Sequence, residues 1–266
     1  MKRREFLKTS VAASSLATLS PIFTANAAAP AAAAREFYEL RLYHVRTGPK
    51  QKIVDDYLRE ALVPGLGRLG VGPVGVFTVM TGPDSPTFYV LIPHKSLESY
   101  AASLRLGQDP EYHKAGADFI NAPATDPAFV RLESSFMVAF PGMPKLEVPE
   151  LAKEKKPRFF ELRTYESHSK KANKKKIEMF DTGEIAIFRR AGLTPVFFGE
   201  TLIGPKLPNL TYLLVYENMA AKDKAWGAFG ADPEWKKLRG TPGFTDPEIV
   251  SNISNVFLRP TAYSQI

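Results

Sequence analysis

The sequence predicts an α+β protein made of two copies of one unit. Three observations lead to this prediction. The strand-like segment FYELRLY at 37–43 returns as FFELRTY at 159–165, later segments return at offsets of 120 to 123 positions, and 44% of the 266 residues are hydrophobic. A repeat at a nearly fixed offset indicates a duplicated structural unit. The hydrophobic content supports buried cores and excludes a disordered chain.

Each copy contains, in order, a strand, an amphipathic helix, two strands joined by a Gly-Pro turn, a second helical stretch and a closing strand. In the first copy the strands and the first helix are expected at 37–44, 49–69, 74–80, 87–93 and 131–140. In the second copy the same elements are expected at 159–165, 173–191, 195–203, 211–217 and 250–258. The order β-α-β-β-α-β is that of a ferredoxin-like unit.

The first helix of the first copy repeats apolar residues at helical spacing, and a glycine at position 70 ends it. The second helical stretch is interrupted by Asp-Pro-Glu at 109–111, and by the same residues at 232–234 in the second copy. Aspartate caps a helix, proline suits its first turn and glutamate favours its positive end. Tyr112 and Trp235 follow directly, so we expect them to anchor the core or an interface.

The chain divides into four segments. Residues 1–27 combine a basic head, including Arg3 and Arg4, with an apolar stretch and a small-residue cleavage site, and they resemble a twin-arginine export signal. The units are expected at 35–140 and 158–260, joined by a Pro- and Lys-rich linker at 141–157. The mature protein is therefore expected outside the cytoplasm, in the periplasm or the extracellular space, without a transmembrane segment.

Charge and composition exclude several kinds of site. The net charge is +7, and residues 1–27 supply +3 of it, which leaves a mild excess. The lysines between 170 and 176 are interpreted as a solvated helix end, and no nucleic-acid surface is predicted. The chain has no cysteine, and its four histidines do not cluster, so no metal site is predicted. His44 alone is a candidate general base, if the fold brings it to a cavity mouth.

The segments FYELRLY, FFELRTY, DPEYHK and DPEWKK, together with the helix-Gly-strand passage of each copy, resemble the NIPSNAP family of the dimeric α/β-barrel superfamily. The resemblance covers nearly all of the mature chain. It implies that each unit supplies half of a barrel, with the two sheets facing one another within one chain. Family members are linked to protein binding, and enzymes of the superfamily include cofactor-free monooxygenases, haem-dependent enzymes and isomerases.

Alternation divides each opening strand into two faces. In the first copy, one face carries Tyr38, Leu40 and Leu42. We expect this face on the helices and the other face in the space between the sheets, where the two copies together supply Phe37, Glu39, Arg41, Tyr43, Phe159, Glu161, Arg163 and Tyr165. Because a buried charge is costly unless it is paired, we expect Glu39 to pair with Arg41 or, across the two copies, with Arg163.

Two interpretations of these charges stay open. They form an ion-pair network that sets the register of the sheets, or they line a polar cavity in which the arginines bind an anionic or carbonyl-bearing ligand, with Glu200 nearby. The corresponding functions are an exported binding or interaction scaffold and, as the alternative, a cofactor-independent or haem-assisted enzyme of monooxygenase or isomerase type acting on a small hydrophobic or carbonyl compound. No catalytic residue is assigned. The partner is a small molecule, another protein or a second copy of the chain.

Overall fold

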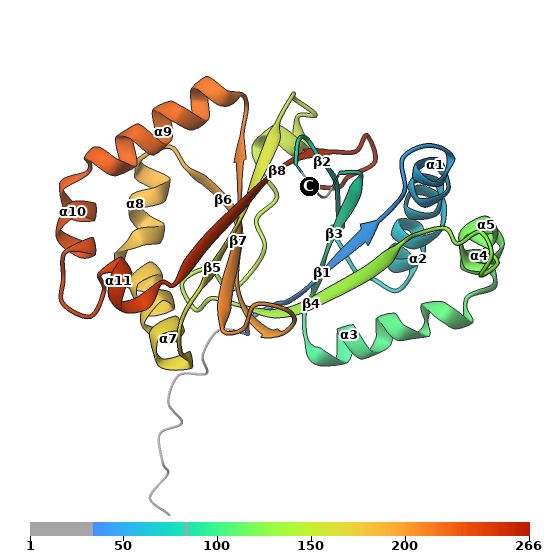
Figure 1. Ribbon diagram of the computed structural model, residues 1–266, viewed down its shortest axis with the longest axis horizontal. Coiled ribbons are helices and arrows are strands. Elements are labelled where there is room, and N and C mark those ends of the chain that lie inside the picture. Colours follow the sequence, from blue (N-terminus) through green and yellow to red (C-terminus); the bar gives the residue numbers. More distant parts are fainter. Residues whose placement is uncertain (1–33, 83–84) are drawn as a thin grey trace, which may run out of the picture. The chain divides into compact units, whose positions relative to one another are not determined.

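A computed structural model describes residues 34–82 and 85–266, in which eight strands close into one barrel (Figure 1). The predicted export signal at 1–27 lies outside the described residues. The strands are β1 (Phe37–His44), β2 (Gly75–Val79), β3 (Thr87–His94), β4 (Arg131–Ala139), β5 (Phe159–Glu166), β6 (Thr194–Ile203), β7 (Asn209–Tyr216) and β8 (Asn252–Pro260). Neighbouring strands are antiparallel throughout.

Each copy contributes four adjacent strands to the barrel. The first copy has the order β4-β1-β3-β2, and the second copy has the corresponding order β8-β5-β7-β6. The two sets join through the pairs β2–β8 and β4–β6. The prediction of two ferredoxin-like units whose sheets form a barrel is confirmed. Closure leaves no unpaired sheet edge among the described strands, because each edge strand of one copy pairs with the other copy.

Helices cover the outside of the barrel, with those of the first copy on one side and those of the second copy on the other (Figure 1). The first copy has α1 (Pro49–Asp56), the wider π-helical turn η1 (Tyr57–Leu62), α2 (Val63–Arg68), α3 (Leu97–Ser103), η2 (Leu104–Gln108), α4 (Pro110–Ala115) and α5 (Ala117–Ile120). Between the copies lies α6 (Glu150–Lys153), within the predicted linker. The second copy has α7 (Lys170–Met179), η3 (Phe180–Glu184), α8 (Ile185–Arg190), α9 (Met219–Ala231), α10 (Pro233–Arg239) and α11 (Asp246–Ile249).

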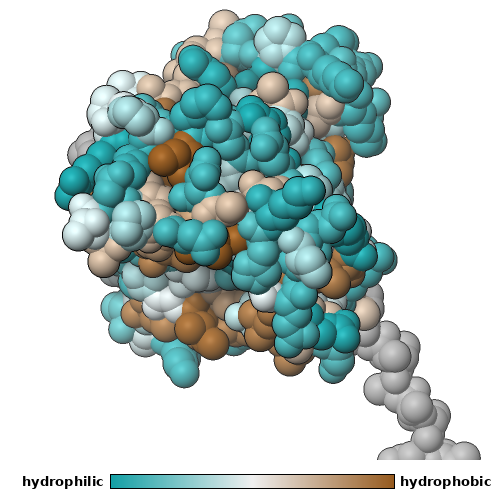
Figure 2. Space-filling view, turned by 90° about the vertical axis from the view of Figure 1, so that its right-hand side faces the viewer, coloured by the Kyte–Doolittle hydropathy of each residue, from teal (hydrophilic) through white to brown (hydrophobic). Residues whose placement is uncertain are grey.

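Local sequence explains where these helices begin. Asp109 caps α4 by accepting a hydrogen bond from the backbone N–H of Glu111, and Asp232 caps α10 by accepting from those of Glu234 and Trp235. A capping side chain satisfies donors that have no partner within the helix. Figure 2 views the side that carries α1 to α5, where hydrophilic residues cover most of the surface and apolar side chains form separate patches.

The apolar residues form three cores. One core lies beneath the helices of each copy, and the third lies inside the barrel. Within the barrel the Tyr38 ring packs 4.9 Å from Phe197, and Phe77 packs 4.8 Å from Phe160. Ile266, from the C-terminal segment, joins this interior core. One end of the barrel is therefore filled with aromatic and aliphatic side chains.

The predicted assignment of strand faces is wrong. Tyr38 and Leu40 point into the barrel, whereas Tyr43 and Tyr165 pack in the cores beneath the helices. The charged side chains of β1 and β5 share the face of these two tyrosines, so they lie outside the barrel. The error arose because both faces of a barrel strand are buried, and alternation does not distinguish the inner face from the outer one.

Two buried tyrosines provide a test of this packing. No described residue forms a hydrogen bond with the Tyr38 hydroxyl, whereas the Tyr212 hydroxyl bonds to Arg163 and Tyr165. Tyr38→Phe should therefore leave the free energy of unfolding within about 0.5 kcal/mol, while Tyr212→Phe should lower it by about 1–2 kcal/mol. Urea unfolding measures both. A larger loss for Tyr38→Phe than for Tyr212→Phe would contradict the assignment.

Candidate functional site

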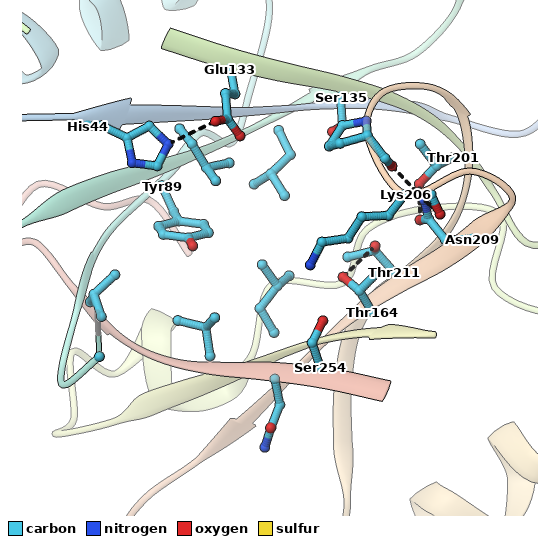
Figure 3. Close-up of a pocket in the computed structure, with 18 of the residues that line it drawn as sticks. His44, Tyr89, Glu133, Ser135, Thr164, Thr201, Lys206, Asn209, Thr211 and Ser254 are labelled. Carbon is cyan, nitrogen blue, oxygen red and sulfur yellow. Dashed lines mark hydrogen bonds and ion pairs between the residues drawn. The ribbon is translucent and has the colours of Figure 1, made fainter. Parts of the chain in front are cut away.

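A cavity of about 440 Å³ lies inside the barrel, at the end opposite the Tyr38–Phe197 contact (Figure 3). Its lining comes from all eight strands and from the loop between β6 and β7. Several of the side chains are small and polar, and they are Ser135, Thr164, Thr201, Asn209, Thr211 and Ser254. Others are apolar, and they are Leu40, Leu42, Val79, Met137, Leu162 and Val256. A concave site with an apolar floor and a few polar groups is typical of small-molecule binding.

The two copies contribute different walls to the cavity. On the second copy, Thr164 of β5 is paired in register with Thr211 of β7 and Ser254 of β8, so three hydroxyl groups lie side by side. The Thr164 and Thr211 hydroxyl oxygens are 3.0 Å apart. On the first copy, Leu42 of β1 is paired with Tyr89 of β3. Leu42 is also paired with Glu133 of β4. Three small hydroxyl-bearing residues therefore lie side by side on the second copy, and the matching positions of the first copy carry a leucine, a tyrosine and a glutamate.

Charged groups gather at the rim of the cavity. Glu133 forms an ion pair with Arg131, and its Oε1 lies 3.4 Å from Nε2 of His44. Nδ1 of His44 lies 3.2 Å from the Thr87 hydroxyl. The fold thus brings His44 to the cavity, which was the condition for its prediction as a candidate general base. Nε2 of His44 is buried and makes no hydrogen bond to a described residue, and Glu133 is its nearest carboxylate.

A lysine enters the cavity from the loop between β6 and β7. Lys206 has a backbone φ of 61°, a left-handed conformation that residues with side chains rarely adopt. The Asn209 side-chain amide donates to the backbone carbonyls of Pro205 and Lys206, at 3.0 and 3.1 Å, and its oxygen accepts from Thr201 at 2.6 Å. Figure 3 shows the Lys206 side chain extending from this loop toward the middle of the cavity.

The charges of β5 form a buried network outside the barrel. Glu161 accepts hydrogen bonds from Arg163 at 2.6 Å and Asn255 at 3.0 Å on one oxygen, and from Tyr216 at 3.0 Å and Trp226 at 3.2 Å on the other. The Arg163 guanidinium also lies 4.8 Å from the centre of the Trp226 ring. Burial alone would raise the pKa of Glu161, but Arg163 and the hydrogen-bond donors hold that pKa below its ordinary value.

The first copy has a sparser version of this network. Glu39 accepts two hydrogen bonds from Arg41, at 2.7 and 2.8 Å, and one from Ser134 at 2.9 Å. His94 stands where the second copy has Tyr216, because β3 pairs with β1 as β7 pairs with β5. Its Nε2 is 4.0 Å from Glu39, and its side chain is fully buried. Burial lowers the pKa of His94 to about 4.

The predicted pairing of Glu39 with Arg41 is confirmed, and the alternative pairing with Arg163 is wrong. The predicted position of these charges in the cavity is also wrong, because none of Glu39, Arg41, Tyr43, Glu161, Arg163 and Tyr165 lines it. Glu200 points outward, next to the inward-facing Thr201, and pairs with Lys174 at 2.6 Å. A ligand-binding role of these residues stays an untested prediction.

The accessory residues and one lysine are placed beneath the helices. The Tyr112 hydroxyl lies 2.9 Å from that of Tyr57, and Trp235 is buried in the second-copy core. Lys176, predicted within a solvated helix end, is instead 1% exposed and bonds to Glu184 at 3.0 Å. The sequence did contain an indication of this pair. Glu184 follows Lys176 by about two helical turns in the same predicted helix, so the two side chains face the same side.

Two further findings concern the described residues. Between residues 34 and 266, with 83 and 84 left aside, no three His, Asp or Glu side chains come together closely enough to hold a metal ion. Over the same residues, no helix combines the length and the hydrophobicity needed to cross a bilayer.

Known proteins share this architecture. The NIPSNAP family model matches residues 38–141 and 160–265. The structure of a "putative monooxygenase" from Lactobacillus acidophilus has a TM-score of 0.57 at 9% identity, covering 85% of this chain and 94% of that chain. A "putative monooxygenase" from Fusobacterium nucleatum has a TM-score of 0.55 at 11% identity, covering 86% and 93%. Identities this low show that the fold is shared and do not establish the activity of this chain.

An uncharacterised NIPSNAP-like domain protein from Burkholderia xenovorans is 22% identical, with a TM-score of 0.36, and the match covers 40% of this chain and 88% of that chain. No curated protein shows significant sequence similarity to this chain.

Removing an arginine from the buried network tests its role. Arg163→Ala leaves the buried carboxylate of Glu161 without its cation, so the free energy of unfolding should fall by about 3 kcal/mol. Because Arg163 does not line the cavity, the affinity for a ligand inside the barrel should not change. Urea unfolding and a binding titration measure the two effects. Arg59→Ala, which removes a half-exposed arginine, is the control and should cost less than about 1 kcal/mol. Unchanged stability with lost binding would refute this assignment.

The buried His94 predicts a pH dependence of stability. Its pKa is about 4 in the folded protein and about 6.5 when unfolded, so the unfolded chain binds more protons between these values. The free energy of unfolding should therefore fall as the pH decreases through this window, by about 2 kcal/mol between pH 7 and pH 5. Urea unfolding at several pH values should show that His94→Leu removes this part of the slope. The exposed His168→Leu is the control, and an equal effect of both variants would contradict the prediction.

Proposed function

The chain belongs to the NIPSNAP family, and we propose that it binds a small amphipathic molecule inside its barrel. The supporting observation is the cavity of about 440 Å³, to which all eight strands contribute. Apolar side chains line part of it, while hydroxyl groups and charged groups lie along one wall and at the rim. This arrangement suits a ligand with an apolar body and one polar end.

Binding is better supported than catalysis. A general base must be free to accept a proton, and the cavity's carboxylate, Glu133, is engaged by Arg131 and faces His44. The Glu–Arg pairs of the opening strands lie outside the cavity, where each carboxylate is satisfied by neighbouring donors. The shared fold with proteins named as monooxygenases carries no residue of this chain into a catalytic role.

The proposal includes export. The basic head with Arg3 and Arg4, the apolar stretch and the small residues before position 28 support a twin-arginine signal, and such a signal would place the binding protein in the periplasm or outside the cell. The barrel is a single chain, so the ligand site requires no second subunit. A protein partner or a homodimer remains compatible with the proposal, because the site lies inside the barrel and leaves the outer surfaces available.

A cavity-filling substitution tests the proposal. Leu42 lines the cavity, so Leu42→Trp should occupy the space that a ligand needs. We expect the wild-type protein to bind the neutral fluorescent probe N-phenyl-1-naphthylamine at one site per chain. Leu42→Trp should weaken this binding at least tenfold, or by about 1.4 kcal/mol. Fluorescence titration measures it, and native mass spectrometry of protein purified from its host shows whether a small molecule is retained.

The matched control is Leu132→Trp. Leu132 lies on β4, and its side chain is 43% exposed and does not line the cavity. This variant should bind the probe as the wild type does. Equal probe binding by Leu42→Trp and the wild type, with both proteins folded by circular dichroism, would rule out the barrel as the site.

A further inference from the structure

Most of the small hydroxyl groups of the cavity, and its lysine, come from the second copy. Thr164, Thr211 and Ser254 place three neighbouring hydroxyl groups on the wall of the second copy. The loop that carries Lys206 joins β6 to β7 of the same copy, and Figure 3 shows its side chain extending into the cavity with these residues around it.

The first copy supplies Leu42 on the matching part of β1. The residues beside Leu42 are Tyr89 and Glu133, and Arg131 pairs with the Glu133 carboxylate. A bound molecule would therefore meet hydroxyl donors and the Lys206 ammonium on the second copy, and Leu42 and Tyr89 on the first.

The loop of Lys206 is held in place by buried polar groups. Asn209 is 2% exposed, and its amide donates to the carbonyl groups of Pro205 and Lys206, which belong to successive peptide groups of the loop. Thr201, 8% exposed, orients Asn209 by donating to its side-chain oxygen. A left-handed backbone at a residue other than glycine persists only where its surroundings enforce it, and such residues concentrate at ligand sites.

The charges of the cavity leave Lys206 as the available cation. The negative charge of Glu133 is balanced by Arg131. Among residues 34–82 and 85–266, no carboxylate forms an ion pair with Lys206, whose side chain extends into the cavity (Figure 3). Arg131, Glu133 and Lys206 together carry one net positive charge. A cavity mouth with this charge attracts anions and repels cations.

We propose that the ligand is an anionic amphiphile, namely a carboxylate carried on an aliphatic chain. Its carboxylate would accept hydrogen bonds from the Lys206 ammonium, from the Ser254 hydroxyl and from whichever hydroxyl of the Thr164–Thr211 pair accepts the bond between them, while the chain lies against Leu40 and Met137 deeper in the barrel. Hydrogen bonds between ionised groups are stronger than neutral ones, and the apolar side chains exclude water from part of the site. The inference rests on the proposed function and adds the chemical class of the ligand.

The experiment compares two probes that differ only in the polar end, decanoate and 1-decanol, by isothermal titration calorimetry at pH 7.5. The wild-type protein should bind decanoate about tenfold more tightly than decanol. Lys206→Met should weaken decanoate binding about tenfold and leave decanol binding unchanged. Lys206→Arg keeps the cation and should retain most of the preference for decanoate.

Lys155→Met is the matched control. Lys155 is also exposed and also has a left-handed backbone, with φ of 54°, but it does not line the cavity. This variant should keep the wild-type preference for decanoate. The comparison separates loss of the cation inside the cavity from a general loss of positive charge and from relief of backbone strain.

The outcomes separate the inference from the proposed function. A preference for decanoate that Lys206→Met removes and Lys155→Met retains would support both. Equal binding of the two probes, or a preference that Lys206→Met does not change, would overturn the inference and leave the binding function standing. If the wild type bound neither decanoate nor decanol, and did not bind the neutral naphthylamine either, the proposed function and the inference would both be overturned.

Discussion

The pairing of β2 with β8 and of β4 with β6 is the constraint on which the other features depend. A single four-stranded sheet would present two unpaired edges, which favour association with other chains. Fusing two copies in one chain allows each edge to pair with the other copy, so the barrel closes within the monomer. Closure also means that every strand has an inner face in the barrel and an outer face beneath the helices.

This division explains where the charges lie. The interior accommodates aromatic and aliphatic side chains at one end and a ligand-sized cavity at the other. The outer face lies close to helices that supply hydrogen-bond partners, such as Trp226 of α9 for Glu161. A carboxylate–guanidinium pair is tolerated in a buried place only when its remaining donors and acceptors are satisfied. The Glu–Arg pairs therefore favour the structural interpretation, which requires no ligand.

Duplication produced two copies that are alike in topology and different in chemistry. Beneath the helices, the second copy surrounds its carboxylate with four donors, whereas the first copy has Arg41, Ser134 and a distant His94. Inside the barrel, hydroxyl groups gather on the wall of the second copy, and leucine stands at the matching place in the first. A symmetric barrel would present the same groups twice. In this cavity the two copies present different groups, so a bound ligand would have one preferred orientation.

The sequence alone was sufficient for the two repeated units, their element order and the Asp109 and Asp232 caps, whereas it left the partner of Glu39 open between Arg41 and Arg163. These features depend on residues close to one another in the chain, or on a pattern that occurs twice. Only the tertiary structure decided which face of each strand lies inside the barrel, because both faces are buried and alternation is the same for either choice. The tertiary structure also determined which residues line the cavity, since Thr164, Lys206 and Ser254 are far apart in sequence and no local pattern marks any of them. Barrel closure brings them together.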